Sequence, residues 1–267
     1  MSATDSELST SKRREALKDL LMQARGCERC TELAATRRTV VFGAGNADAE
    51  LMFIGEAPGA SEDEQGLPFV GRAGKLLDQL LVEIGMERKD VFVANVLKCR
   101  PPGNRDPLPI EIENCHEYLL GQVELIQPAV ICTLGNFSTK LLRADPTGIT
   151  RLHGQPEVLT IGSRTVRLYP IYHPAAALYT PRMLETLRED FARLPELLGL
   201  GAPEQLQVPK MPEMAEAQAG AETAAGAEMA AEAEEATGTE LAEEASGAEA
   251  AAEAEQKSSG PDQLGLF

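Results

Sequence analysis

The sequence lacks any long run of apolar residues. No stretch of about eighteen apolar residues, the length needed to cross a lipid bilayer, occurs in the 267 residues of the chain. The first residues, MSATDSELSTSKRR, also lack the apolar segment of a secretory signal peptide. We therefore expect a soluble, cytoplasmic protein that enters no membrane and whose thiols stay reduced.

Aromatic residues are absent from residues 201–256, which consist mostly of Ala, Glu and Gly. Such a composition buries too little apolar surface to fold, so we expect a disordered acidic linker over residues 201–259. We expect residues 1–12 to form a flexible N-terminus, residues 13–200 the folded domain and residues 260–267 a separate terminal peptide.

The net charge of −17 is concentrated in that linker. Residues 201–256 hold 14 Glu and one Lys, which gives a net charge of −13. Residues 1–200 hold 23 Lys and Arg against 27 Asp and Glu, so they carry only −4. The acidic total therefore does not exclude nucleic acid as a partner of the folded domain.

Short apolar runs alternate with longer helical stretches through the domain. The predicted strands span residues 51–55, 91–96, 129–135 and 164–173, and the predicted helices span residues 14–24, 73–85, 109–126, 136–144 and 181–199. This alternation predicts a three-layer α/β/α fold with a mainly parallel central sheet. In such sheets sites form at the carboxyl ends of strands, where GEAPG, Asn95 and HPAAAL stand.

Five cysteines in a reducing compartment indicate metal or cluster chemistry before disulfides. Cys27 and Cys30 form a C-x2-C pair, and Cys99 and Cys115 follow farther along the chain. This spacing fits a zinc ion or an iron–sulfur cluster equally well, with two pairs of unrelated thiols as a third possibility. Cys132 lies within a predicted strand, where we expect a free core cysteine.

The stretch GEAPGASEDEQGLPFVGRAG, residues 55–74, carries the most specific pattern. Gly55 and Gly59 allow a sharp turn after a strand, which projects the carboxylate of Glu56. Phe69 follows, and the GRAG segment opens a predicted helix whose N-terminus can receive a phosphate.

Together with the four cysteines, ANVLKCRPPGNRD and YHPAAAL, this pattern resembles the family 4 uracil-DNA glycosylases, iron–sulfur members of the uracil-DNA glycosylase superfamily. The resemblance covers about residues 14–199. It implies a uracil-DNA glycosylase-like fold and a hydrolase of N-glycosidic bonds. Such an enzyme flips uracil out of single- or double-stranded DNA and leaves an abasic site for base excision repair. We expect it to act as a monomer and to be nucleoid-associated.

The resemblance also assigns roles to particular residues. The ligands of a structural [4Fe–4S] cluster would be Cys27, Cys30, Cys99 and Cys115. The uracil-binding positions would be Gly55, Glu56, Ala57, Ser61, Phe69, Asn95 and His173. Of these, Glu56 and His173 would be catalytic, Phe69 would stack on the base and Asn95 would read it.

These residue types suit the chemistry. The uracil leaves as an anion while the sugar gains cationic character, so a carboxylate can orient water and stabilise the sugar. A histidine beside uracil O2 stabilises the departing anion. Asn95 can accept a hydrogen bond from uracil N3–H and donate one to O4, a pairing that cytosine reverses. Glu62 and Asp63 are nearby carboxylates that could act on the water instead of Glu56.

Positive side chains around these motifs are candidate phosphate contacts, namely Arg72, Lys98, Arg100 and Arg105.

Two other functions compete with that of a glycosylase that turns over its substrate. Some relatives trap uracil-DNA covalently through a histidine and carry a basic insertion after the first motif, which is absent here although His153 is present. A non-catalytic iron–sulfur DNA-binding protein would have no use for Glu56, Asn95 and His173 together.

The terminal peptide QLGLF places apolar side chains beyond a polar tail. Gln263, Leu264, Leu266 and Phe267 resemble the short peptide with which bacterial replication and repair proteins bind the sliding clamp. An extended peptide of this kind inserts Leu and Phe into an apolar pocket. We therefore expect the sliding clamp as a partner, reached through the linker as a tether.

Overall fold

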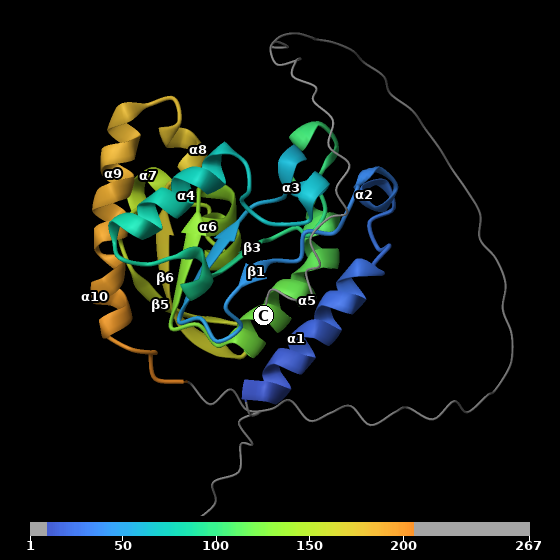
Figure 1. The fold of residues 1–267 in the computed structure, drawn as a ribbon, viewed down its shortest axis with the longest axis horizontal. Coiled ribbons are helices and arrows are strands. Elements are labelled where there is room, and N and C mark those ends of the chain that lie inside the picture. The colour runs from blue at the N-terminus through green and yellow to red at the C-terminus, as the bar shows by residue number, and fades with distance from the viewer. Residues whose placement is uncertain (1–9, 206–267) are drawn as a thin grey trace, which may run out of the picture. The chain divides into compact units, whose positions relative to one another are not determined.

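The computed structural model describes residues 10–205 of the chain (Figure 1). Most of the predicted flexible N-terminus, nearly all of the predicted linker and the whole terminal peptide lie outside the described residues. Among the helices within residues 10–205, none is long and apolar enough to cross a membrane.

The centre of the domain is a six-stranded sheet with the strand order β1-β3-β2-β4-β6-β5. The strands are β1 (Ala44–Gly45), β2 (Leu51–Gly55), β3 (Phe92–Asn95), β4 (Val130–Leu134), β5 (Glu157–Ile161) and β6 (Arg164–Ile171). Strands β3, β2, β4 and β6 run parallel, whereas β1 and β5 pair antiparallel at the two edges. The prediction of a mainly parallel sheet is confirmed.

Helices cover both faces of this sheet, as Figure 1 shows. One face packs against α1 (Thr10–Arg25) and α5 (Pro109–Ile126), and the other against α4 (Arg72–Glu83) and α9 (Pro181–Ala192). Alternation along β2 sends Met52 and Ile54 into the first core and Leu51 and Phe53 into the second. A strand covered on both faces reads as a continuous apolar run, which is why LMFIG is apolar throughout.

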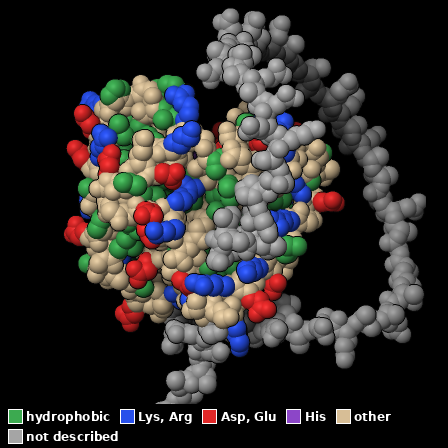
Figure 2. All heavy atoms as spheres, viewed as in Figure 1, with side chains coloured by type: hydrophobic (Ala, Val, Ile, Leu, Met, Phe, Trp, Pro, Cys, Tyr) green, Lys and Arg blue, Asp and Glu red, His purple; other side chains and the backbone are tan. Residues whose placement is uncertain are grey.

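The remaining elements are short and connect these layers. They are α2 (Thr31–Thr36), α3 (Ala60–Gln65), α6 (Asn136–Arg143), α7 (Ile149–Leu152), α8 (Pro174–Ala177), α10 (Leu194–Gly199) and the 3-10 turns η1 (Arg88–Asp90) and η2 (Pro102–Asn104). Acidic and basic side chains are interspersed over the face of the domain drawn in Figure 2. That mixture agrees with the small net charge of residues 1–200.

Two features of the fold differ from the sequence prediction. The helix predicted over 181–199 is divided into α9 and α10 around Arg193. Pro195 explains the division, because it has no N–H to donate and its ring disfavours a continuing helix. The edge strands β1 and β5 are also additional, since β1 has two residues and β5 is partly exposed along its length.

Candidate active site

The carboxyl ends of β2 and β3 lie side by side, because Gly55 and Asn95 are register partners. A Cβ atom on Gly55 would stand 2.4 Å from Asn95 Oδ1 and 2.7 Å from the Phe69 ring. Real Cβ atoms do not approach other atoms that closely, so only glycine allows the amide and the ring to meet here. Three predicted uracil-binding residues are therefore brought together at one point.

Asn95 presents an unusual buried group. The residue is 2% exposed, and its Oδ1 atom has no hydrogen-bond partner within the described part of the chain. A buried acceptor without a donor costs about 1–3 kcal/mol. Such a group in a native structure needs an explanation, and a bound ligand that donates an N–H is the simplest one.

Phe69 forms the wall beside this amide. Its ring lies 5.5 Å from the His173 ring, centroid to centroid, with the planes tilted by 30°. Its backbone has a φ of 53°, an uncommon conformation for a large side chain. Gly74 of α4 contributes to holding it, because a Cβ there would stand 1.7 Å from the Phe69 carbonyl oxygen. The backbone of α4 thus packs directly on the loop that carries Phe69.

The carboxylates Glu62 and Asp63 on α3 are engaged in structural contacts. Glu62 Oε1 accepts hydrogen bonds from the backbone N–H groups of Val70 and Gly71, at 3.0 and 2.9 Å. Asp63 is 3% exposed and accepts from the backbone N–H groups that follow α2, including that of Arg38 at 2.9 Å. These carboxylates brace loops, and neither lines the pocket described below.

His173 stands directly after β6 and caps α8. Its Nδ1 atom accepts the backbone N–H of Ala175 at 3.1 Å. Burial lowers the pKa of His173 to about 4, so the ring is neutral near pH 7. Because Nδ1 is an acceptor, the single proton of the neutral ring resides on Nε2. His173 therefore offers one N–H donor from Nε2 without carrying a positive charge.

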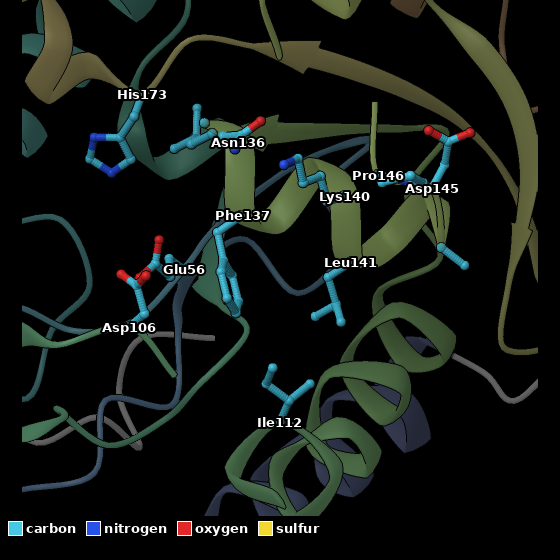
Figure 3. A pocket seen from close by; sticks show the side chains of 13 residues that line it. Glu56, Asp106, Ile112, Asn136, Phe137, Lys140, Leu141, Asp145, Pro146 and His173 are labelled. Atoms are coloured by element: carbon cyan, nitrogen blue, oxygen red, sulfur yellow. The ribbon is translucent and has the colours of Figure 1, made fainter. Parts of the chain in front are cut away.

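Glu56 and His173 line a pocket of about 670 Å³ (Figure 3). Burial, and next the negative charge of Asp106, raises the pKa of Glu56 above its ordinary value. Figure 3 shows the Glu56 and Asp106 side chains next to each other on one side of the pocket. The opposite side is formed by α6, with Asn136 and Lys140.

Sequence reasoning had not selected Asp106, Asn136 or Lys140 as site residues. Asp106 ends the quoted motif ANVLKCRPPGNRD, so the motif carried a usable signal. Asn136 and Lys140 lie on a correctly predicted helix, but nothing in its periodicity shows that one of its faces borders the pocket. Of the predicted uracil-binding positions, only Glu56 and His173 line the pocket. Gly55, Phe69 and Asn95 lie together outside its lining, with the Phe69 ring against the His173 ring. Ala57 is partly buried and Ser61 is exposed on α3, and neither lines the pocket.

The four candidate phosphate contacts differ in how accessible their side chains are. Arg72 and Arg100 are on the surface or partly exposed, and Arg72 lies over the exposed ring of Tyr179. Arg105 is held by Glu111 and Glu32. The prediction for Lys98 is wrong, because this side chain is 1% exposed and donates to internal oxygen atoms. It is not available to a DNA phosphate.

The four predicted ligand cysteines lie near one another. Burial raises the pKa of Cys115 to about 11, with smaller contributions from the neighbouring Cys99 and Cys30 thiols. Cys99 in turn interacts electrostatically with Cys27 and Cys30. Within residues 10–205, no three His, Cys, Asp or Glu side chains close on a single metal-ion position. Cys132 is a free, fully buried cysteine in β4, as predicted.

The sulfur atoms of the four predicted ligand cysteines each accept an N–H hydrogen bond. The donors are Arg29 Nε to Cys27 at 3.4 Å, Asn114 Nδ2 to Cys30 at 3.5 Å, Arg37 Nη1 to Cys99 at 3.2 Å and Lys98 N to Cys115 at 3.3 Å. Hydrogen bonds of this kind stabilise thiolates. Each of the four sulfurs thus has an N–H donor that favours its thiolate form, whereas burial opposes that form at Cys99 and Cys115 by raising their pKa.

A buried amide, an aromatic ring, a neutral histidine and a carboxylate thus lie at or near the carboxyl ends of parallel strands in an α/β fold. Residues 42–195 match the model of the uracil DNA glycosylase superfamily. The chain belongs to this superfamily.

Several relatives that match most of the folded domain are type-4 enzymes. The chain is 45% identical over 193 residues to a type-4 uracil-DNA glycosylase from Archaeoglobus fulgidus, covering 71% of this chain and 96% of the relative. It is 46% identical over 181 residues to a type-4 enzyme from Saccharolobus solfataricus, covering 66% and 83%. A type-4 enzyme from Thermotoga maritima is 41% identical over 167 residues, covering 62% and 85%.

Proposed function

We propose that this protein is a type-4 uracil-DNA glycosylase, which hydrolyses the N-glycosidic bond of uracil in DNA and leaves an abasic site for repair. Family membership and the type-4 relatives support the activity. The observation in the structure that carries it is Asn95 Oδ1, which lies buried next to Gly55 and Phe69 and has no hydrogen-bond partner among residues 10–205. Uracil supplies the missing donor.

Uracil recognition follows from the chemistry of this amide. Uracil N3–H donates to Asn95 Oδ1, and the Asn95 NH₂ group donates to uracil O4. Cytosine presents an acceptor at N3 and a donor at C4, so both hydrogen bonds would be lost and buried polar groups left unpaired. Phe69 supplies a face on which the flipped base stacks, a contact of about 1–3 kcal/mol.

Bond cleavage is assigned to Glu56 and His173. The neutral His173 donates from Nε2 to uracil O2, where negative charge grows as the base leaves, without having to lose a proton first. The Glu56 carboxylate orients the attacking water and stabilises the cationic sugar. The two tasks require an ionised Glu56 and a neutral His173. The Glu56 pKa is raised and the His173 pKa is lowered, so this combination of protonation states occurs only above the pKa of Glu56.

We further propose that Cys27, Cys30, Cys99 and Cys115 hold a [4Fe–4S] cluster. The likeness to type-4 enzymes supports the cluster, and the four thiols lie close enough to interact electrostatically, as the ligands of one cluster would. When bound, the cluster supplies a structural cross-link between the C-x2-C segment, the loop after β3 and α5.

The covalent-trap alternative receives no support from the position of His153. Its Nδ1 atom lies 3.2 Å from an Asp190 carboxylate oxygen, and its ring packs on Tyr172 with centroids 4.6 Å apart. It is not among the residues that line the pocket with Glu56. A histidine held in this way is directed at its partners and not at a sugar.

An oligonucleotide assay tests the activity directly. A labelled strand with one uracil, alone or paired with guanine, is incubated with the protein, treated with alkali and run on a denaturing gel. We expect strand cleavage with turnover, while hypoxanthine and xanthine strands measure the substrate range. A slow-migrating covalent band would instead indicate a trap, and an intact strand in a gel-shifted complex would indicate a non-catalytic binder.

We also propose that the protein is a cytoplasmic monomer that binds the bacterial sliding clamp through Gln263, Leu264, Leu266 and Phe267. These residues lie outside the described part of the chain, and the proposal rests on the peptide's sequence. The isolated clamp is titrated with the full chain, with a chain ending at Gly260 and with Leu266→Ala/Phe267→Ala. Only the full chain should bind tightly, and equal affinity of all three would refute the proposal. Light scattering of the full chain measures its molar mass and so tests the prediction that it is a monomer.

A further inference from the structure

Lys98 is a lysine buried in the core. It is 1% exposed, and within residues 10–205 it forms no salt bridge with an Asp or Glu. Its Nζ atom donates to the backbone carbonyl of Asn95 at 2.7 Å and to Gln122 Oε1 at 2.6 Å. Burying an ammonium group is costly even when it is hydrogen-bonded, so the side chain is expected to serve a purpose beyond packing.

The four residues from Asn95 to Lys98 connect the two sites of the domain. The backbone N–H of Lys98 donates to Cys115 Sγ at 3.3 Å. On the other side, Val96 N–H donates to the Gly55 carbonyl and Leu97 N–H to the Glu56 carbonyl, both at 3.0 Å. One short segment is therefore bonded both to a cysteine of the ligand set and to the strand end that carries Glu56.

Gln122 holds the Lys98 ammonium group in place. It is fully buried on α5, the helix that also carries Cys115, and its Nε2 atom donates to the Phe42 carbonyl at 2.8 Å. The Lys98 carbonyl also accepts from Val41 N–H at 2.7 Å. The ammonium group is thus anchored to α5 on one side and holds the Asn95 backbone on the other.

We propose that Lys98 is a positioning residue whose buried ammonium group fixes the uracil-reading amide of Asn95. This inference rests on the proposed role of Asn95. The two hydrogen bonds of the Lys98 ammonium go to the Asn95 carbonyl and to Gln122, so it acts through the Asn95 backbone and not on the base. A misplacement of about 1 Å at a reacting or reading group can cost about 10²-fold in rate, which makes an anchor on the Asn95 carbonyl valuable.

The test compares Lys98→Met with Asn95→Ala and a control. Met keeps the length and apolar stem of the side chain but removes its N–H donors. Binding of free uracil is followed by ligand-observed NMR, and single-turnover rate, affinity for abasic DNA and the iron content are measured in parallel. We expect Lys98→Met to weaken uracil binding and lower the rate by about tenfold or more, with DNA affinity and iron content within about twofold of the parent. The exposed Lys89→Met serves as the matched control.

A double-mutant cycle separates positioning from general destabilisation. If Lys98 acts through Asn95, Lys98→Met should change the rate by less than about twofold in the Asn95→Ala background. Additive losses, or unchanged uracil binding in Lys98→Met, would overturn the proposal. If Asn95→Ala itself leaves uracil binding intact, the assignment of Asn95 fails instead, which distinguishes the two ideas.

A second variant covers the case in which Lys98→Met does not fold. Gln122→Met leaves residues 95–99 untouched but removes the second partner of the Lys98 ammonium. We expect a loss of uracil binding and rate in the same direction, about three- to fivefold, again with unchanged affinity for abasic DNA. If Gln122→Met binds uracil as the parent does, the anchor has no effect on recognition and the proposal is refuted.

Discussion

At the scale of single residues, the structure distinguishes side-chain oxygens that accept a hydrogen bond from one that has no donor among the described residues. Glu62 and Asp63 have backbone donors, whereas Asn95 Oδ1 has none within the described part of the chain. The sequence analysis selected all three residues but could not tell which of them have hydrogen-bond donors in the fold. Hydrogen-bond satisfaction depends on neighbours that are distant along the chain, so it becomes readable only in the fold.

Asn95→Asp tests the assignment of the base reader. A carboxylate can accept from N3–H but cannot donate to O4, and two acceptors then face each other in a buried site. We expect the rate on uracil to fall by about 10- to 100-fold, which corresponds to roughly 1.5–3 kcal/mol, and discrimination against cytosine to weaken. Single-turnover assays on uracil and cytosine strands measure both. Full uracil activity would show that another residue reads the base.

The acid side of the pH–rate profile should report Glu56. Burial and Asp106 raise the Glu56 pKa, so activity should be lost as the pH falls through a value above the ordinary glutamate pKa. Asp106→Asn removes a neighbouring negative charge and favours ionised Glu56, so the acid limb should move to lower pH. His173 ionises only near pH 4 and does not set this limb. A limb that stays in place or moves upward contradicts the assignment.

At the scale of elements, much of the architecture follows from local patterns. The helix predicted over 109–126 matches α5, because Pro109 stands in its first turn and Gln127 adopts a left-handed conformation after its end. The same reasoning fails at Arg193, where Pro195 divides an amphipathic pattern into two helices. The φ of 53° at Phe69 was not predictable, since it is imposed by Glu62 and by the packing of Gly74.

Glu62→Ala tests the brace on the Phe69 loop. The Val70 and Gly71 N–H groups lose a charged acceptor, so we expect a loss of roughly 1–3 kcal/mol in the free energy of unfolding. The single-turnover rate should fall as well, because Phe69 is no longer held against Gly55 and His173. Denaturant unfolding and kinetics measure the two effects. Glu64→Ala, on an exposed position of α3, is the control, and equal behaviour of the two variants would argue against the brace.

At the scale of the whole molecule, the cysteine set joins parts of the chain that are far apart in sequence. Cys27 and Cys30 lie between α1 and the start of α2, Cys99 follows β3 and Cys115 lies on α5. A group bound by all four would cross-link these segments in the folded state only, and its binding energy would add to folding. The spacing of the cysteines alone leaves zinc and a cluster equally open, and the family likeness favours the cluster.

The proposed cluster gives a direct spectroscopic prediction. Purified protein should be brown, absorb in the visible range and contain about four iron and four sulfide per chain. Cys99→Ser should lose this absorption and much of its stability, whereas Cys132→Ser, in the β4 core, should keep the absorption. A colourless protein with stoichiometric zinc would contradict the proposal.

The central claim is that the buried Asn95 amide receives the uracil N3–H. A crystal structure of the protein with DNA that carries a non-hydrolysable 2′-fluoro-deoxyuridine tests it most directly. The account predicts uracil N3 at about 2.7–3.2 Å from Asn95 Oδ1, with the base against Phe69 and O2 facing His173 Nε2. A uracil bound elsewhere, with Asn95 Oδ1 still lacking a donor, would contradict it.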